Sequence, residues 1–235
     1  MMKHRIAVAA GILFTAGVAH ADSYSVTPTI ATDYDFRGES LTDPVGGDGK
    51  VAFQLGGTYN FDNAVYVGAW GSNIDNSYPG AAQGGVGAGK DGNNVEIDLF
   101  AGYAWGDASS SFAYDVGLYA YTYPGWNRDN TVEAYVGVAR SIYSAKLWYS
   151  PDVASSKKSG VYAELNANIP MGGIDNLTLV LHVGQAFGAA YNEPVDFSVG
   201  TAYNIDKLRF AVRYVDRTKG TPSRVVGSLS TTLPW

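Results

Sequence analysis

The stretch that decides the fold closes the chain: it runs from Arg224 to Trp235 and reads RVVGSLSTTLPW. Positions of one parity are mostly apolar and hold Val225, Gly227, Leu229, Thr231, Leu233 and Trp235. Positions of the other parity are mostly polar and include Arg224, Ser228, Ser230 and Thr232. A period of two with one apolar face is the pattern of a β-strand. We therefore predict that the chain ends in a strand with one apolar and one polar face.

The terminal Trp235 adds a second signal to this strand. An aromatic residue that ends an alternating strand resembles the C-terminal signature of bacterial outer-membrane β-barrels. There it helps the barrel assembly machinery to recognise the last strand, so Trp235 is a candidate assembly signal and that machinery is an expected partner. The alternative is the last strand of a soluble β-sandwich. The rest of the chain has to decide between the two.

The N-terminus predicts export from the cytoplasm. Lys3 and Arg5 precede an apolar run over residues 6–18, and Ala19-His20-Ala21 forms an A-x-A cleavage site. We therefore expect a cleaved signal peptide over residues 1–21 and a mature barrel over residues 22–235. Cleavage removes Lys3 and Arg5 and no acid, so the formal net charge falls by two, from −6 to −8. A chain this acidic lacks the basic footprint of a nucleic-acid-binding protein.

Composition limits the remaining classes. No later stretch approaches the roughly 20 continuous apolar residues that a membrane helix requires, so a membrane protein of this sequence has to be a barrel. The chain has no cysteine, which excludes disulfides, thiol catalysis and thiolate metal sites. Its 29 glycines and 17 tyrosines suit strands with closely spaced backbones and aromatic rings at a membrane interface.

Alternation of apolar and polar residues continues from residue 23 to the end and divides the chain into about twelve segments of barrel-strand length. The first segment is expected to run to Phe36, with Tyr34 and Phe36 on its apolar side. Longer connections follow the odd-numbered segments, and short turns such as Asp62-Asn63 follow the even-numbered ones. Outer-membrane barrels sort their loops and turns in this way, with both termini in the periplasm. We therefore predict an all-β fold: a transmembrane, antiparallel, up-and-down β-barrel of about 12 strands in the bacterial outer membrane, with periplasmic termini.

Two stretches carry a family resemblance. They are SVTPTIATDYDFRGES, from Ser25 to Ser40, and FDNAVYVGAWGSN, from Phe61 to Asn73. Both resemble the TorF family of proposed porins of Gram-negative bacteria, and the similarity extends more loosely over most of the mature chain. The resemblance implies a barrel and a proposed channel. It implies neither a known substrate nor a catalytic residue.

Three patterns in the chain resemble chemical sites. The run from Gly84 to Lys90 reads G-x-x-x-x-G-K, but Asp91 stands where a Walker A loop needs Ser or Thr, so a loop tip is the better interpretation. His182 is the only histidine that remains after signal cleavage, so a histidine-dependent hydrolase would have to use it. Its parity predicts that it points inward, and no nucleophile motif accompanies it. Five oxygen-bearing loop residues lack calcium-loop spacing and are expected to form turns: Asp43, Asp48, Asp91, Asn93 and Asn94. We expect no enzyme activity, cofactor or metal.

Charged residues on the polar parity are the more informative set. The predicted pore-lining acids are Asp33, Asp35, Glu96, Asp98, Asp115, Glu133, Glu164 and Asp196. The predicted pore-lining bases are Arg209, Arg213 and Arg224, with Lys207 beside them, on the last two strands. Opposed acidic and basic walls would orient solutes in a water-filled pore. Alternatively, Arg213 and Arg224 pair with Asp33 and Asp35 inside a packed interior.

Six aromatic residues share the inward parity, so any channel is expected to be narrow: Phe100, Tyr119, Tyr121, Tyr135, Trp148 and Tyr162. The favoured function is passive diffusion of small polar or charged solutes, with outer-membrane lipid as the surroundings and a homo-oligomer as one possible state. A structural or adhesive barrel with a plugged lumen and a binding surface on its loops is the alternative. A lipid-facing hydrolase that depends on His182 is the third.

Overall fold

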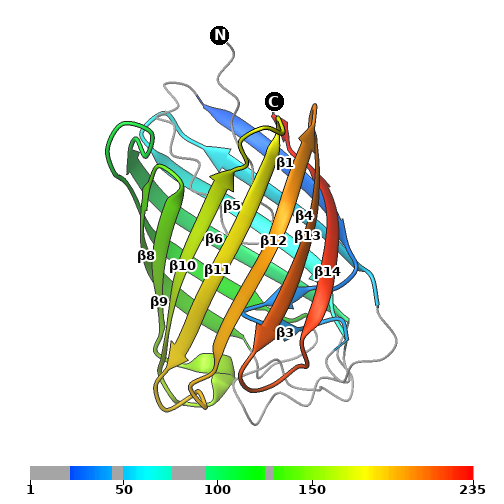
Figure 1. Cartoon of the computed structure of the whole chain (residues 1–235). Helices are drawn as coiled ribbons and strands as arrows, with labels where there is room; N and C mark the ends of the chain where they lie inside the picture. The colour runs from blue at the N-terminus through cyan, green and yellow to red at the C-terminus, as the bar shows by residue number, and fades with distance from the viewer. Residues whose placement is uncertain (1–21, 44–49, 76–93, 125–129, 235) are drawn as a thin grey trace.

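The chain forms a closed antiparallel β-barrel in a computed structural model, which describes residues 22–43, 50–75, 94–124 and 130–234 (Figure 1). The strands of the wall are β1 (Ser23–Ala31), β4 (Ala52–Asn60), β5 (Val65–Asn73), β6 (Val95–Gly106), β7 (Ala113–Thr122), β8 (Thr131–Arg140), β9 (Tyr143–Ser150), β10 (Gly160–Pro170), β11 (Leu177–Phe187), β12 (Val195–Ile205), β13 (Leu208–Arg217), β14 (Arg224–Thr231) and β15 (Leu233–Pro234). A short hairpin of β2 (Asp35–Phe36) and β3 (Glu39–Ser40) pairs apart from the wall, and a 3-10 helix, η2 (Val153–Ser155), follows β9.

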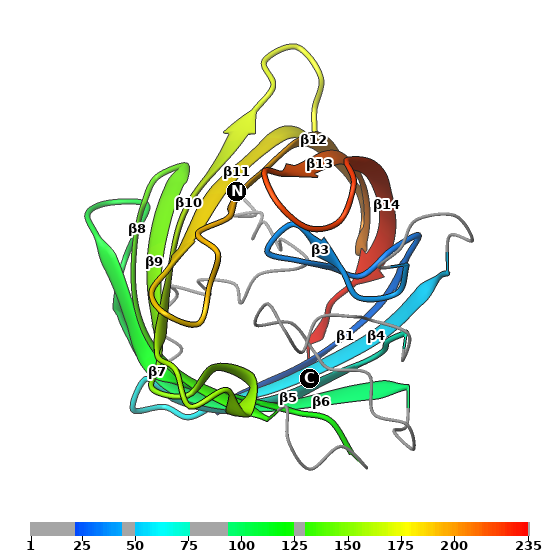
Figure 2. The ribbon, with the colours of Figure 1, turned by 90° about the horizontal axis from the view of Figure 1, so that it is seen from below.

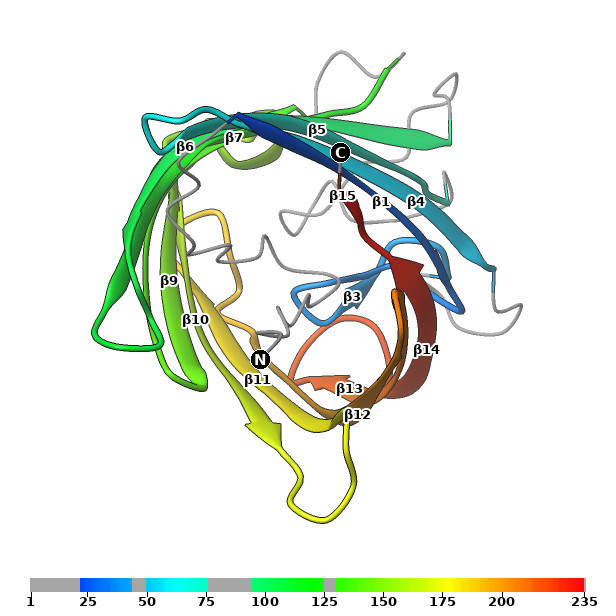
Figure 3. The same ribbon diagram turned by 90° about the horizontal axis from the view of Figure 1, so that it is seen from above.

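The barrel closes where the chain begins and ends. Ile30 of β1 pairs with Leu229 of β14, and Val26 pairs with Leu233 of β15 (Figure 3). β14 and β15 form one wall strand that is interrupted at Thr232, so the thirteen strand segments of the main sheet make twelve wall strands. Every neighbouring pair is antiparallel, as expected for hairpin connections. The predicted barrel of about twelve strands is confirmed.

The predicted division into two faces also holds. Apolar side chains of one parity point outward and stay exposed: Leu55 is 57% exposed, Leu118 58%, Leu165 60% and Val225 64%. Residues of the opposite parity point inward and are buried, as Val226 is at 3%. Because side chains alternate along a strand, a single register places the whole apolar set outside.

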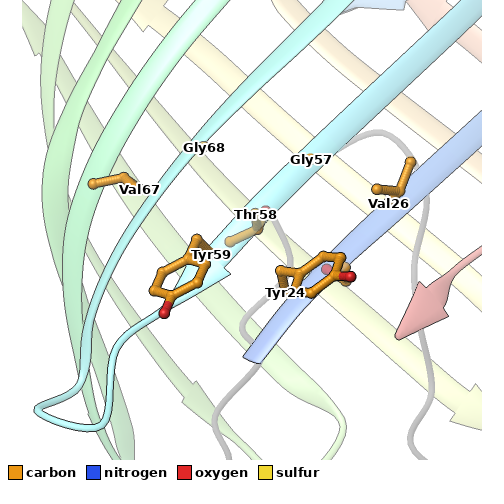
Figure 4. Close-up of a pocket in the computed structure, with 8 residues that line it drawn as sticks. Tyr24, Val26, Gly57, Thr58, Tyr59, Val67 and Gly68 are labelled. Carbon is orange, nitrogen blue, oxygen red and sulfur yellow. The ribbon is translucent and has the colours of Figure 1, made fainter. Parts of the chain in front are cut away.

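Aromatic residues on the outer face gather at the two ends of the strands. At the end with the short turns these are Tyr24, Tyr59, Phe61, Tyr103, Trp105, Phe112, Tyr114, Tyr143, Tyr203 and Phe210. At the other end they are Phe53, Tyr149, Phe187, Phe197 and Tyr214. Between the rings of Tyr24 and Tyr59 the outer face has a shallow apolar hollow, where Gly57 adds no side chain (Figure 4).

Connections are sorted between the two ends of the barrel. Residues 61–64, 107–112, 141–142, 171–176 and 206–207 turn at the end that also holds the start of β1 and the end of β15 (Figure 1). The connections at the opposite end are generally longer, and the one between β1 and β4 spans residues 32–51. This sorting is the predicted one. Within the described ranges, no helix is long and apolar enough to cross a membrane.

One prediction about the wall is wrong. The first strand ends at Ala31 instead of Phe36, and residues 32–43, here called the inner segment, fold into the lumen (Figure 2). Asp33 and Asp35 therefore lie on this segment and not on the wall, and Tyr34 and Phe36 do not face outward. The cause is local: the Asp33 carboxylate accepts hydrogen bonds from the Ser40 and Thr42 hydroxyls, at 2.5 and 2.7 Å, which competes with pairing in the wall.

Candidate functional site

The inner segment crosses the lumen and contacts the wall on nearly all sides. Its residues Tyr34, Phe36 and Arg37 reach side chains of β5 to β10. Its acidic residues reach arginines on β13 and β14. Figure 2 shows the β2–β3 hairpin within the ring of strands. Any path through the barrel therefore has to pass this segment, which makes it the candidate functional site.

The tip of the hairpin is a two-residue turn, Arg37-Gly38, between the paired residues Phe36 and Glu39. Arg37 has φ of 51° and Gly38 has φ of 79°, as a type I′ turn requires. A Cβ atom on Gly38 would lie 2.6 Å from the Cβ atom of Asp196 on β12, so only glycine fits here. The left-handed backbone conformation is unfavourable for arginine. The contacts of the Arg37 side chain therefore have to compensate for this cost.

Arg37 fixes the hairpin tip to the far wall. Its Nη1 and Nη2 atoms donate to the two carboxylate oxygens of Glu133 on β8, at 2.9 and 2.5 Å. The guanidinium lies 4.2 Å from the ring centroid of Tyr162 and 5.5 Å from that of Trp148. Burial lowers the pKa of Arg37, but the charge and hydrogen bonds of Glu133 outweigh this and hold the pKa well above its usual value. Arg37 is therefore a permanent cation in a bidentate pair.

The opposite side of the hairpin is held by arginines. Arg224, at the start of β14, pairs through Nε with Asp33, and its Nη2 donates to Asp35 at 2.8 Å. Its Nη1 also donates to the carbonyl oxygen of Gly38 at 2.9 Å. Arg213 lies 3.5 Å from Asp35, measured from Nη2 to Oδ2. The structure thus brings together the residues of the alternative interpretation, in which Arg213 and Arg224 pair with Asp33 and Asp35.

Acidic residues on the β6 side are bound by tyrosines. Glu96 and Asp98 occupy successive inward positions of β6 and are almost completely buried. The Tyr34 hydroxyl donates to Glu96 Oε1 at 3.0 Å, and the Tyr119 hydroxyl donates to Asp98 Oδ2 at 2.9 Å. The second oxygen of each carboxyl group has no hydrogen-bond partner. Tyr34 therefore links the inner segment to a pair of buried, neighbouring carboxyl groups on β6.

The remaining inward acids have partners of their own. Asp115 accepts from Lys146 Nζ at 3.1 Å and from the Tyr66 hydroxyl at 2.7 Å. Glu164 accepts from Trp148 Nε1 at 3.0 Å. Asp115 and Glu164 are thus held by partners on the neighbouring wall strands.

Inward aromatic rings lie flat on glycines of the neighbouring strand. The paired residues Tyr66 and Gly102, Gly68 and Phe100, and Gly117 and Tyr135 follow this arrangement. A Cβ atom on Gly102 would lie 2.4 Å from the Tyr66 hydroxyl oxygen, so the ring takes the space that a larger residue would need. These rings therefore lie along the wall. The inward rings of Tyr121 and Tyr162 contact Phe36 and Arg37 and form the aromatic bed under the hairpin tip.

The predicted pore-lining residues all face the lumen side of the barrel, but they do not form two open walls. The members of the set are Asp33, Asp35, Glu96, Asp98, Asp115, Glu133, Glu164, Asp196, Arg209, Arg213 and Arg224. Lys207 was wrongly grouped with them, because it is exposed in the turn between β12 and β13. The sequence reasoning missed Glu39 and Arg217, which form an ion pair. Gly38 was the available signal for a turn at this point, since glycine readily takes the positive φ of the second turn position.

Several predictions lie outside the described residues. These are the signal peptide, the G-x-x-x-x-G-K run with Asp91, the residues Asp48 and Asn93, and the assembly signal Trp235. Among the residues that the structure does describe, no group of three or more His, Asp or Glu side chains is placed to hold a metal.

His182 is placed unfavourably for a hydrolase. Its Nδ1 lies 2.7 Å from Asn166 Oδ1, and its Nε2 lies 2.8 Å from Asp196 Oδ1. Tyr162 also approaches Nε2, at 3.1 Å. Both ring nitrogens are engaged, so neither is free to take a proton from a nucleophile. The arrangement is that of a lumen-facing histidine bound to a carboxylate.

The closed twelve-strand barrel with this inward segment defines a porin-like β-barrel fold. Residues 15–229 match the family described as "Bacterial protein of unknown function (Gcw_chp)", and the chain belongs to that family. A comparison with curated proteins finds no match.

Solved structures share the fold at low sequence identity. A chain described as "KdgM porin" is 9% identical, with a TM-score of 0.50 over 89% of this chain and 98% of that one. A chain from work on in-meso crystallization of membrane proteins is 10% identical, with a TM-score of 0.54 over 90% of this chain and 84% of that one. The COG4313 outer membrane channel of Pseudomonas putida F1 is 9% identical, with a TM-score of 0.49 over 94% and 98%.

Proposed function

We propose that this protein is an outer-membrane channel for passive diffusion of small polar or charged solutes, narrowed by its inner segment. One observation carries the proposal: a closed barrel that is apolar outside and charged inside, in which residues 32–43 cross the lumen. An apolar outer surface has to be covered, and a lipid bilayer covers it on all sides at once. A charged interior suits polar solutes.

The outer face supports the membrane location. Two bands of exposed aromatic residues flank an aliphatic belt, which is the arrangement of barrels that cross an outer membrane. In this proposal residues 1–21 are removed on export, Trp235 guides the assembly machinery, and the resemblance to the TorF family reflects a shared porin-like role. Assembly into a homo-oligomer is part of the same proposal.

A plugged structural barrel is the second candidate, and a specific observation favours it. Arg213 and Arg224, which would face water in an open pore, pair with carboxylates of the inner segment. Buried pairs of this kind fill space and neutralise the charges that would act on passing ions. In the channel proposal the inner segment narrows the path, whereas in this second proposal it closes the path.

Single-channel recording separates the two candidates. The mature chain, residues 22–235, is refolded and inserted into planar lipid bilayers, beside a variant in which residues 33–42 are replaced by a Gly/Ser linker of equal length. We expect small conductance steps from the wild type and larger steps from the linker variant. Steps from the variant alone would establish the plugged barrel, and the absence of steps from both proteins would rule out a channel. Heat-modified mobility in gels checks that both proteins fold.

A further inference from the structure

We infer that four arginines on β13 and β14 form a binding track for anionic solutes, which carry carboxylate or phosphate groups. The four are Arg209, Arg213, Arg217 and Arg224, here called the basic ladder. Three of them are occupied by carboxylates of the protein's own inner segment. The inference rests on the proposed function, because it names the class of solute that the channel takes.

The ladder is a product of strand geometry. Arg209, Arg213 and Arg217 are four residues apart on β13, so all three point to the lumen and follow one another at intervals of about 13 Å. Arg224 joins them from β14, close to the same end as Arg217. A row of guanidinium groups along one wall runs lengthwise through the barrel, which is the direction that a solute has to travel.

Carboxylates of the inner segment bind the arginines at the end of the ladder near the longer connections. Asp35 approaches both Arg213 and Arg224, and Glu39 pairs with Arg217. These carboxylates do not belong to the wall. They are carried by a hairpin that enters the lumen from a connection, so they occupy the arginines as a separate anionic body would.

Arg209 continues the ladder without such a partner. Within the described ranges it forms no ion pair, and its single polar contact is with Asn204 Oδ1 at 3.5 Å. It is only 5% exposed, and a buried guanidinium without an anion is costly. Its neighbours inside the barrel are small: Ala211 on its own strand, and Ser228 and Ser230 on β14. An anion at this position would meet the Arg209 guanidinium and neighbouring serine hydroxyls, among small side chains.

Arg213 is also loosely held. Its contacts are 3.5 Å to Ser198 Oγ and 3.5 Å to Asp35 Oδ2, both at the outer limit for hydrogen bonds. An anion between Arg209 and Arg213 would meet two guanidinium groups that present planar pairs of donors, the geometry that carboxylates and phosphates accept best. On the acid-rich side Glu133 and Asp115 already have basic partners, and Glu96 and Asp98 are bound by tyrosine hydroxyls.

The test uses citrate as a carboxylate probe, inorganic phosphate as a phosphate probe and glucose as a neutral control. Refolded mature protein is recorded in potassium chloride while each probe is added to one side. We expect citrate and phosphate, but not glucose, to block the current reversibly. Arg209→Gln should raise the half-blocking concentration about ten-fold, as the loss of one charge-assisted contact predicts. Lys207→Gln removes the same charge two residues away, outside the lumen, and should leave the block unchanged.

A second measurement makes the result independent of conduction. Citrate should raise the unfolding temperature of the detergent-folded wild type and of Lys207→Gln, and raise that of Arg209→Gln much less. If the protein conducts but neither anion blocks the current selectively, the proposed anion-binding track is wrong and the proposed channel function still stands. Stabilisation by citrate without conductance would uphold the site and remove the channel. Equal responses of the two glutamine variants would also overturn the assignment of Arg209.

Discussion

At the scale of single residues, Arg37 decides where the inner segment lies. Its backbone is left-handed, which is unfavourable, and its side chain forms a bidentate pair with Glu133 over the aromatic bed. Arg37→Ala strands the Glu133 carboxylate, which is 3% exposed, and we expect a loss of about 3–5 kcal/mol in the free energy of unfolding. Urea titration of the refolded barrel measures this. Arg37→Lys keeps the charge but cannot donate to both Glu133 oxygens from one planar group, so it should restore only part of the lost stability. Full restoration would show that the charge alone matters.

Glu96 and Asp98 give a second prediction at this scale. Two carboxyl groups lie at successive inward positions with one unpartnered oxygen each. Glu96→Gln replaces one of two adjacent buried carboxyl groups by a neutral amide, which can donate to the unpartnered Asp98 oxygen, so stability should be kept or increased. Tyr34→Phe removes the hydroxyl that binds Glu96 and should cost about 1 kcal/mol. Unfolding free energies of the two variants check both signs, and a large loss for Glu96→Gln would contradict the account.

At the scale of strands, the pairing of aromatic rings with glycines predicts which glycines are fixed. Gly102→Ala on β6 would push a methyl group into the Tyr66 ring, which also holds Asp115, and should cost about 1–3 kcal/mol. Gly57→Ala on β4 is the matched control, because the nearest atom to its Cβ lies 3.9 Å away on the open outer face. Equal unfolding midpoints for the two variants would show that the rings adapt freely.

The strands were predictable and the inner segment was not, for one physical reason. Alternation reports which side of a strand is apolar, and it assigned the outer face of β6, β7 and β13 correctly. Tyr34 and Phe36 continue the same alternation, but an aromatic-lined interior satisfies them as well as lipid does. The same limit applied to the candidate site. Parity predicted which charged residues point inward. It could not predict their partners, since the pairing of Arg217 with Glu39 depends on where the hairpin goes.

At the scale of the whole molecule, the apolar belt makes a depth-dependent prediction. Leu118 lies near the middle of β7 and is 58% exposed, so Leu118→Arg should cost about 2–4 kcal/mol in lipid vesicles. Leu208 opens β13 beside a short turn, and Leu208→Arg should cost about 0–1 kcal/mol. Unfolding free energies measured in vesicles give the comparison. Equal costs for the two variants would mean that the belt does not face a bilayer.

The position of the inner segment between the first and last wall strands also fixes the order of biogenesis. The segment follows β1 directly, whereas Arg224, which holds Asp33 and Asp35, opens β14 at the far end of the chain. A growing chain therefore makes the two aspartates long before it makes the residue that neutralises them. An incomplete chain carries these charges in an open sheet without their counterion. When β14 pairs with β1, the barrel closes and Arg224 meets Asp33 and Asp35. The same step therefore completes the wall and neutralises the hairpin, and it requires the last strand.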